Sequence, residues 1–217
     1  DVRSHLQVTV LQALADGPPV ARVSEKLREI ALAKDRPLWM RERAAEVLVA
    51  KPADQNAVRR ALIDDLCALS PDRSQLAIRA RVLAGIPTNE IRTAELRQLL
   101  LDFDALPARS RDDDDIDDTG SLVPLSIALR RSPRADLFDD GIGSVLNQGQ
   151  HKSEVQSLLN QALVAAIRAN PEITAARLWS WLDNVREHRW DMLDSDVVEA
   201  IRGWIDRDTD RRELELF

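Results

Sequence analysis

The chain has 217 residues, of which 44% are hydrophobic and 31% are charged, so it can form a sizeable core and is not a disordered tail. No apolar run approaches the roughly 18 to 20 residues that span a bilayer, and we expect no membrane span. Seven glycines, no tyrosine and the lack of alternating runs of valine, isoleucine and threonine argue against a β-sheet. The composition therefore predicts an all-α fold.

The single cysteine, Cys67, lies in an apolar stretch and has no partner for an intramolecular disulfide. We expect a small buried thiol in a cytoplasmic protein, because structural disulfides mark oxidising compartments. The sequence begins at Asp1 without a signal segment, and we expect it to be part of a longer protein.

Charge divides the sequence into two unlike halves. Residues 1–100 carry 16 basic and 13 acidic side chains, whereas residues 101–217 carry 14 basic and 24 acidic ones. A formal net charge of −7 gives no general attraction to phosphate backbones or anionic lipids, although a local arginine face could still act. Nucleic acid and membranes are therefore disfavoured as partners.

Three stretches of the first half resemble one another. Residues 43–52 and 78–87 share alanine, valine, leucine and proline at an offset of 35 positions. At an offset of 34, Leu14 and Pro18 correspond to Leu48 and Pro52. A helix that ends in a proline turn thus occurs three times. Such a period indicates a solenoid.

Each proline turn is followed by a second segment, whose apolar residues recur every three to five positions and lie near one face of a helix. These residues are Val23, Leu27 and Ile30 in the first unit, Val58, Leu62, Leu66 and Leu69 in the second, and Ile91, Leu96, Leu100 and Phe103 in the third. Because each stripe must be covered by its neighbour, we predict an α-solenoid of stacked helix pairs.

An acidic stretch follows the repeats. Residues 104–120, with six aspartates between positions 112 and 118, are too charged to pack and predict an exposed loop. Helical segments are then expected at 122–131, 133–146, 153–169, 171–187 and 195–206. The predicted organisation is helical repeats over 1–103, an acidic loop over 104–120 and a C-terminal helical subregion over 121–217.

Residues 35–48 resemble a HEAT-type helical repeat, with an Asp and a Pro at the turn, an Arg six residues after the Asp, and then small residues and Leu. The resemblance implies a HEAT-like solenoid in which such Asp and Arg side chains bond along the stack, as Asp35 and Arg41 could do. The next unit departs from the pattern, because Asp72 and Arg79 are seven positions apart.

A wider resemblance covers about residues 35–215. The sequences of residues 78–87, 95–100, 120–125 and 136–138 resemble those found in the C-terminal helical region of large bacterial NACHT-type (STAND) signal-transduction ATPases. In that family helical repeats follow the nucleotide-binding module and serve as sensor or scaffold. The resemblance implies a similar role here.

Two short motifs imitate metal sites. Residues 99–104 look like the apolar strand and Asp that hold Mg²⁺ in P-loop ATPases, but no lysine follows a glycine-rich phosphate loop, so we expect a helix end. Residues 115–120 match the opening of a calcium loop, but position twelve is Ser126 rather than Glu and Pro124 intrudes.

No other residues form a catalytic or metal-binding pattern. The three histidines, at positions 5, 151 and 188, lack metal-ligand spacing, and no Ser or Cys has the context of a nucleophile. We therefore expect no metal, no cofactor and no enzymatic activity in this part of the protein.

The tryptophans are the remaining candidates for function, since large aromatic residues are enriched at binding hot spots. Trp179 shares a helix face with Leu182, and Trp204 lies on a similar apolar stripe, so we expect both in the core. Trp181 is offset from that stripe and Trp190 lies between helices. These two are the predicted partner-binding residues.

The leading hypothesis is a non-catalytic helical-repeat region that binds another protein or another part of its own parent chain. The alternative is a HEAT-like nucleic-acid-binding or DNA-processing module. It depends on an arginine surface built from Arg36, Arg41, Arg43, Arg59, Arg60, Arg79 and Arg81. We expect these arginines to pair instead with nearby carboxylates, namely Asp35, Glu42, Glu46, Asp64 and Asp65.

Overall fold

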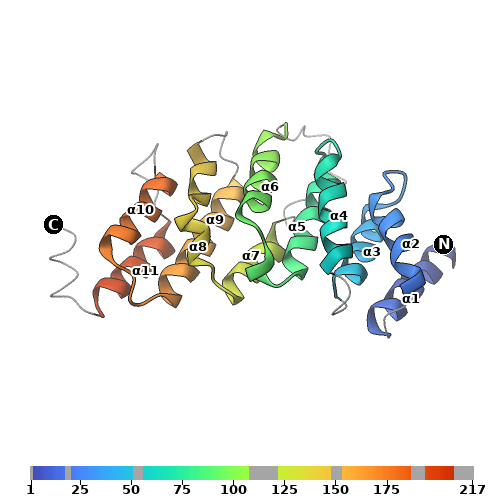
Figure 1. The fold of residues 1–217 in the computed structure, drawn as a ribbon, viewed down its shortest axis with the longest axis horizontal. Coiled ribbons are helices and arrows are strands. Elements are labelled where there is room, and N and C mark those ends of the chain that lie inside the picture. The colour runs from blue at the N-terminus through green and yellow to red at the C-terminus, as the bar shows by residue number, and fades with distance from the viewer. Residues whose placement is uncertain are drawn as a thin grey trace. The chain divides into compact units, whose positions relative to one another are not determined.

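The computed structural model describes residues 2–17, 21–50, 56–107, 122–147, 153–186 and 194–207, which contain eleven α-helices, two short 3-10 helices and no strand (Figure 1). The elements are α1 (Val2–Asp16), α2 (Ala21–Leu32), α3 (Leu38–Ala50), α4 (Asn56–Ala68), α5 (Arg73–Gly85), η1 (Thr88–Glu90), α6 (Thr93–Ala105), α7 (Val123–Arg131), α8 (Ala135–Asp139), η2 (Ile142–Asn147), α9 (Ser153–Ala169), α10 (Ala175–Arg186) and α11 (Ser195–Ile205). The all-α prediction is confirmed for these ranges. None of their helices combines the length and the apolar character needed to cross a bilayer.

The chain divides into two compact units, residues 1–87 and residues 88–217. The sequence placed the first boundary later, after residue 103. The difference arises at α6, which was expected to complete the third repeat but packs against η2 and α9 of the second unit. The buried residues Leu96, Leu99 and Leu100 supply the apolar face of α6.

Helix pairs build the first unit. α2 packs on α3, and α4 packs on α5. α3 also contacts α1 and α5, so that α1, α3 and α5 are successive neighbours, and α2 contacts α4 less extensively. α3, whose buried residues include Ala44 and Leu48, thus contacts α1, α2 and α5.

Small residues allow α3 and α5 to approach closely. Ala44 on α3 and Ala80 on α5 have no exposed surface. At the end of α5, a Cβ atom added to Gly85 would stand 2.4 Å from Cγ1 of Val49 on α3. Only glycine fits so close to a stiff β-branched side chain without a shift of one helix.

The predicted bonding of Asp35 along the stack is corrected. Asp35 is 80% exposed and contacts only its neighbour Arg36, at 4.0 Å, among the ion pairs of the described residues. Arg41 is buried and donates from Nε to the carbonyl of Ala31 at 3.2 Å. Burial lowers the pKa of the Arg41 guanidinium, and the charge of Asp72 in the next helix pair opposes this effect.

Asp72 therefore supplies the link that was expected of Asp35. Its carboxylate caps α5 by accepting from the backbone N–H of Gln75 at 2.9 Å, which satisfies one free donor of the first turn. It also lies 3.2 Å from Nζ of Lys34, which precedes α3. The seven-residue spacing from Asp72 to Arg79 thus does not prevent contact between the two helix pairs.

α9 lies at the centre of the second unit, where α6, α7, α8, η2 and α11 contact it. Its apolar face is confirmed by the burial of Val155, Leu158, Leu159, Ala162, Leu163, Ala166 and Ile167. α7 and α11 both contact α9, so that α7, α9 and α11 are successive neighbours. η2 in turn contacts both α6 and α10.

Three local predictions were wrong. The helix expected over 133–146 is divided at Gly141, whose φ of 72° is left-handed and ends α8. Asp104 belongs to the last turn of α6 and is buried, so the acidic loop cannot begin there. Cys67 is exposed rather than buried. The rest of the predicted loop, from residue 108, lies outside the described residues.

Candidate interaction surfaces

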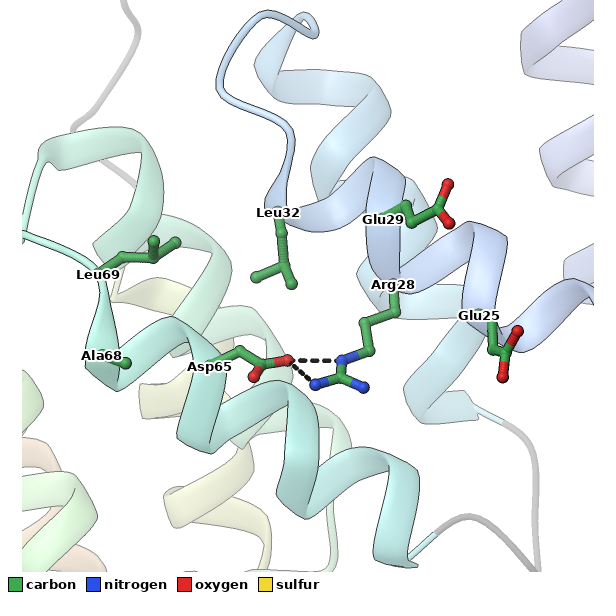
Figure 2. A pocket seen from close by; sticks show the side chains of 7 residues that line it. All are labelled: Glu25, Arg28, Glu29, Leu32, Asp65, Ala68 and Leu69. Atoms are coloured by element: carbon green, nitrogen blue, oxygen red, sulfur yellow. Dashed lines mark hydrogen bonds and ion pairs between the residues drawn. The ribbon is translucent and has the colours of Figure 1, made fainter.

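The first candidate surface is a groove between α2 and α4. It has a volume of about 540 Å³ and is lined by Glu25, Arg28, Glu29, Leu32, Asp65, Ala68 and Leu69 (Figure 2). Leu27 and Ala31, on the other side of α2, are buried and anchor the helix. The amphipathic sequence of α2 thus leaves one edge of the helix for the groove.

An ion pair crosses the α2–α4 groove. Figure 2 shows Arg28 reaching from α2 toward Asp65 of α4, where Nε donates to Oδ2 at 2.5 Å and Nη2 contacts the same oxygen. The side chains are 41% and 32% exposed, so solvent screens the pair, which contributes at most about 1 kcal/mol. The pair bridges α2 and α4, whereas small residues bring α3 and α5 together.

The two ends of the α2–α4 groove differ in chemistry. Leu32 and Leu69 point into the same gap in Figure 2 and form an apolar end. Glu25 and Glu29 lie along the edge of α2, and Glu29 accepts from Nζ of Lys26 at 2.5 Å. With three carboxylates and one guanidinium among its lining residues, the groove is locally acidic.

A second hollow lies on the other side of α2. It has a volume of about 340 Å³ and is lined mainly by apolar side chains of α1, α2 and α3: Val10, Leu11, Leu14, Val23, Leu27, Ile30 and Met40, with Gln7, Lys26 and Arg36. Val10 is 50% exposed at its edge. α2 is therefore flanked by hollows on two sides.

The second unit has a groove between α7 and α9, with a volume of about 610 Å³. It is lined by Leu122, Val123, Ser126, Ile127, Arg130, Ser153, Glu154, Ser157, Leu158 and Gln161. Ser126 donates from Oγ to Oε1 of Gln161 at 2.5 Å, and Nε2 of Gln161 donates to Oγ of Ser157 at 3.0 Å. This chain of hydrogen bonds joins the two walls of the α7–α9 groove.

The structure corrects the prediction for Trp181, which is fully buried and offers no surface to a partner. Its ring centroid lies 5.6 Å from that of Phe138, and the guanidinium carbon of Arg177 is 5.3 Å from its centroid. The indole Nε1 donates to Oδ1 of Asp139 at 2.8 Å. Trp181 therefore joins α10 to α8 within the core.

The other tryptophans of the C-terminal half differ in their burial. Trp204 is buried as expected, and its Nε1 donates to the carbonyl of Ile173 at 3.1 Å. Trp179 was expected in the core but is 36% exposed, because Leu178, Trp181 and Leu182 form the buried face of α10. Trp190, the second predicted anchor, lies outside the described residues.

The arginines of the first unit pair largely as expected. Arg81 contacts both Glu42 and Glu46, and Arg43 reaches Glu46 at 2.7 Å. Arg41 and Arg79 are buried. Burial raises the pKa of Glu46, and the hydrogen bonds from Arg43 and Arg81 outweigh it, so that the pKa is lowered. Four of the seven arginines on which the nucleic-acid alternative depended are thus held by carboxylates or by the core.

The candidate metal motifs lie on helices where they are described. Residues 99–104 belong to the C-terminal half of α6, which confirms the helix end expected there. Pro124 and Ser126 belong to α7, whereas residues 115–120 lie outside the described ranges. In the described part of the chain, no three His, Cys, Asp or Glu side chains gather as a metal site would require.

Comparison with known proteins gives no family. No protein-family model matches the sequence, and neither the curated proteins nor the solved structures contain a match.

Proposed function

We propose that the chain is a HEAT-like α-solenoid without catalytic activity of its own, which serves as a scaffold or sensor by binding another protein or another part of its parent chain. One observation carries the proposal: α1, α3 and α5 are successive neighbours in the first unit, and α7, α9 and α11 are successive neighbours in the second. Repeat stacks of this kind present long continuous surfaces suited to protein binding.

The surfaces of both units support this function. Apolar side chains are exposed in each: Val8, Val10, Trp39, Val123, Ile127 and Trp179. Val10 borders the hollow beside α2, and Val123 and Ile127 line the α7–α9 groove. Apolar groups that border open grooves are typical anchors for a partner, since their contact with water is removed on binding.

We further propose that the parent chain is a NACHT-like ATPase, on the basis of the resemblance of residues 78–87 and its neighbouring segments. The test is the coding sequence upstream of Asp1. A glycine-rich phosphate loop followed by lysine and serine or threonine would support this parentage, and a different domain there would contradict it.

The proposed binding function is tested with the full chain as an affinity bait in an extract of its source, followed by titration with each purified candidate. A saturable complex with one protein supports the function. The same chain is mixed with duplex DNA at low and moderate salt. Tight duplex binding that weakens steeply with salt, without a protein partner, would replace the proposal with the nucleic-acid alternative.

A further inference from the structure

We propose that the apolar hollow between α1, α2 and α3 binds a small amphipathic anion. Its tail, a hydrocarbon chain of about eight to ten carbons, lies against the helices, and its carboxylate or similar anionic head lies near Lys26 and Arg36. This site is separate from the proposed protein-binding function and does not depend on it.

The hollow has an apolar floor. Leu11 of α1, Leu27 of α2 and Met40 of α3 line it, and none of them is more than 6% exposed. Packed protein interiors leave few spaces larger than a water molecule, whereas this one has about 340 Å³. Water is a poor occupant, because each molecule needs about two to four polar partners and only three of the ten described lining residues are polar. The floor therefore favours an apolar ligand.

The size of the hollow limits the kind of ligand. An α-helix about 10 Å across fills about 420 Å³ in each turn, which exceeds the whole volume of about 340 Å³. The same volume corresponds to roughly eleven groups of the size of a water molecule, and a methylene group is of similar size. A single hydrocarbon chain therefore fits into the hollow, whereas a partner helix cannot enter it.

The charged residues of the lining are both cations. Lys26 lies on α2 and Arg36 lies in the turn before α3, and no carboxylate is among the described residues that line the hollow. Their side chains are 70% and 51% exposed, so their aliphatic stems border the hollow and their charged ends reach its mouth. A ligand with its tail on the buried floor thus has its head near two positive charges.

Both cations already contact carboxylates outside the lining. Nζ of Lys26 lies 2.5 Å from Glu29, and Nε of Arg36 lies 4.0 Å from Asp35. All four side chains are more than half exposed, and such exposed pairs contribute little to stability. Exchange of these carboxylates for the head of a ligand therefore costs little.

The proposal is tested by methyl NMR titration of the full chain with octanoate and octylammonium, which share one chain length and carry opposite charges. Hexanoate and decanoate vary the length of the tail. Val23→Phe fills part of the hollow, and Lys26→Gln/Arg36→Gln removes its two cations. Arg28→Gln/Lys34→Gln is the matched control, because it removes one Arg and one Lys that are not among the described lining residues.

We expect octanoate to bind saturably and to shift the methyl resonances of Leu11 and Met40, while octylammonium binds at least about tenfold more weakly. Affinity should rise about fourfold for each methylene added between hexanoate and octanoate. Val23→Phe should weaken the binding of octanoate at least about tenfold. Lys26→Gln/Arg36→Gln should lose the preference for octanoate over octylammonium, whereas the control variant should keep it.

Equal affinities of the natural chain for octanoate and octylammonium, or an equal loss of preference in the control variant, would overturn the proposal. If a variant loses its helical circular dichroism, the natural chain decides: octanoate must shift the methyl resonances of Leu11 and Met40, and octylammonium must do so more weakly. If neither probe binds saturably but the partner found in the bait experiment shifts these resonances, the hollow takes an apolar side chain of that partner and the anion site is refuted.

Discussion

Asp139, the last residue of α8, accepts a hydrogen bond from the indole Nε1 of Trp181 on α10 at 2.8 Å. The same carboxylate accepts from Arg177, at 2.9 Å from Nε and 2.5 Å from Nη2. One side chain thus satisfies the polar group of a buried tryptophan and neutralises the arginine beside its ring. This carboxylate and the ring of Phe138 both link α8 to Trp181 of α10.

Replacement of Asp139 should separate these two contributions. Asp139→Ala leaves the indole N–H without its acceptor, which costs about 1 to 3 kcal/mol. Asp139→Asn keeps an oxygen for Trp181 and loses mainly the pair with Arg177, which is partly exposed and contributes about 1 kcal/mol or less. Urea denaturation near neutral pH measures both losses. Equal losses in the two variants would show that the indole hydrogen bond contributes nothing measurable.

The stability of the chain should depend on pH through Asp139. The hydrogen bond from Arg177 lowers the pKa of this carboxyl below its ordinary value of 3.8, burial opposes it, and the bond from Trp181 adds to it. A lowered pKa in the folded state means that the stabilisation is complete above pH 3.8 and is lost as the pH falls through the folded value.

The difference in unfolding free energy between the natural chain and Asp139→Asn should therefore be constant at neutral pH and shrink at acid pH. Urea denaturation of both proteins at a series of pH values measures this difference. A gap that stays constant down to the lowest pH at which both remain folded would contradict the assigned pairing.

Two glycines should respond to alanine in opposite directions. Gly85→Ala places a methyl group against Val49, and overpacking of this kind costs about 1 to 3 kcal/mol. Gly203 on α11 has no heavy atom within 4 Å of the added methyl position, so Gly203→Ala should stabilise the helix by about 0.5 to 1 kcal/mol. Thermal and urea denaturation compare the variants. A stabilising Gly85→Ala would mean that α3 and α5 are not in close contact at this point.

Helix periodicity predicted the class of the fold and some faces from the sequence alone. In residues 153–169 apolar residues occupy one wide stripe, and that stripe is buried in α9. The stripe of α6 was also found, yet the unit to which it belongs was not, because periodicity defines the face that is covered and says nothing about which helix covers it.

The grooves could not be predicted for a related reason. The α2–α4 groove depends on the spacing of two helices, which follows from small residues between α3 and α5 and from the bridge between Arg28 and Asp65. These contacts join residues 36 or 37 positions apart along the chain. A local pattern contains no information on such distances.

On α10, the choice of face was decided by a residue far away in the sequence. The spacing of Trp179 and Leu182 suggested one apolar face, but Leu178, Trp181 and Leu182 fit a helix period equally well. Asp139, 42 positions before Trp181, supplies the hydrogen-bond acceptor that the indole needs in the core. The exposed tryptophan of this helix is therefore Trp179.

The assignment of the two tryptophans gives a final prediction. Trp181→Ala removes a fully buried ring that packs on Phe138 and should cost about 3 to 5 kcal/mol. Trp179→Ala changes a side chain that is 36% exposed and should cost about 1 kcal/mol or less. Urea denaturation of the two variants, with circular dichroism to follow helix content, ranks the two losses. If Trp179→Ala is the more damaging substitution, α10 buries the face first suggested by its sequence, and Trp181 again becomes a candidate for partner binding.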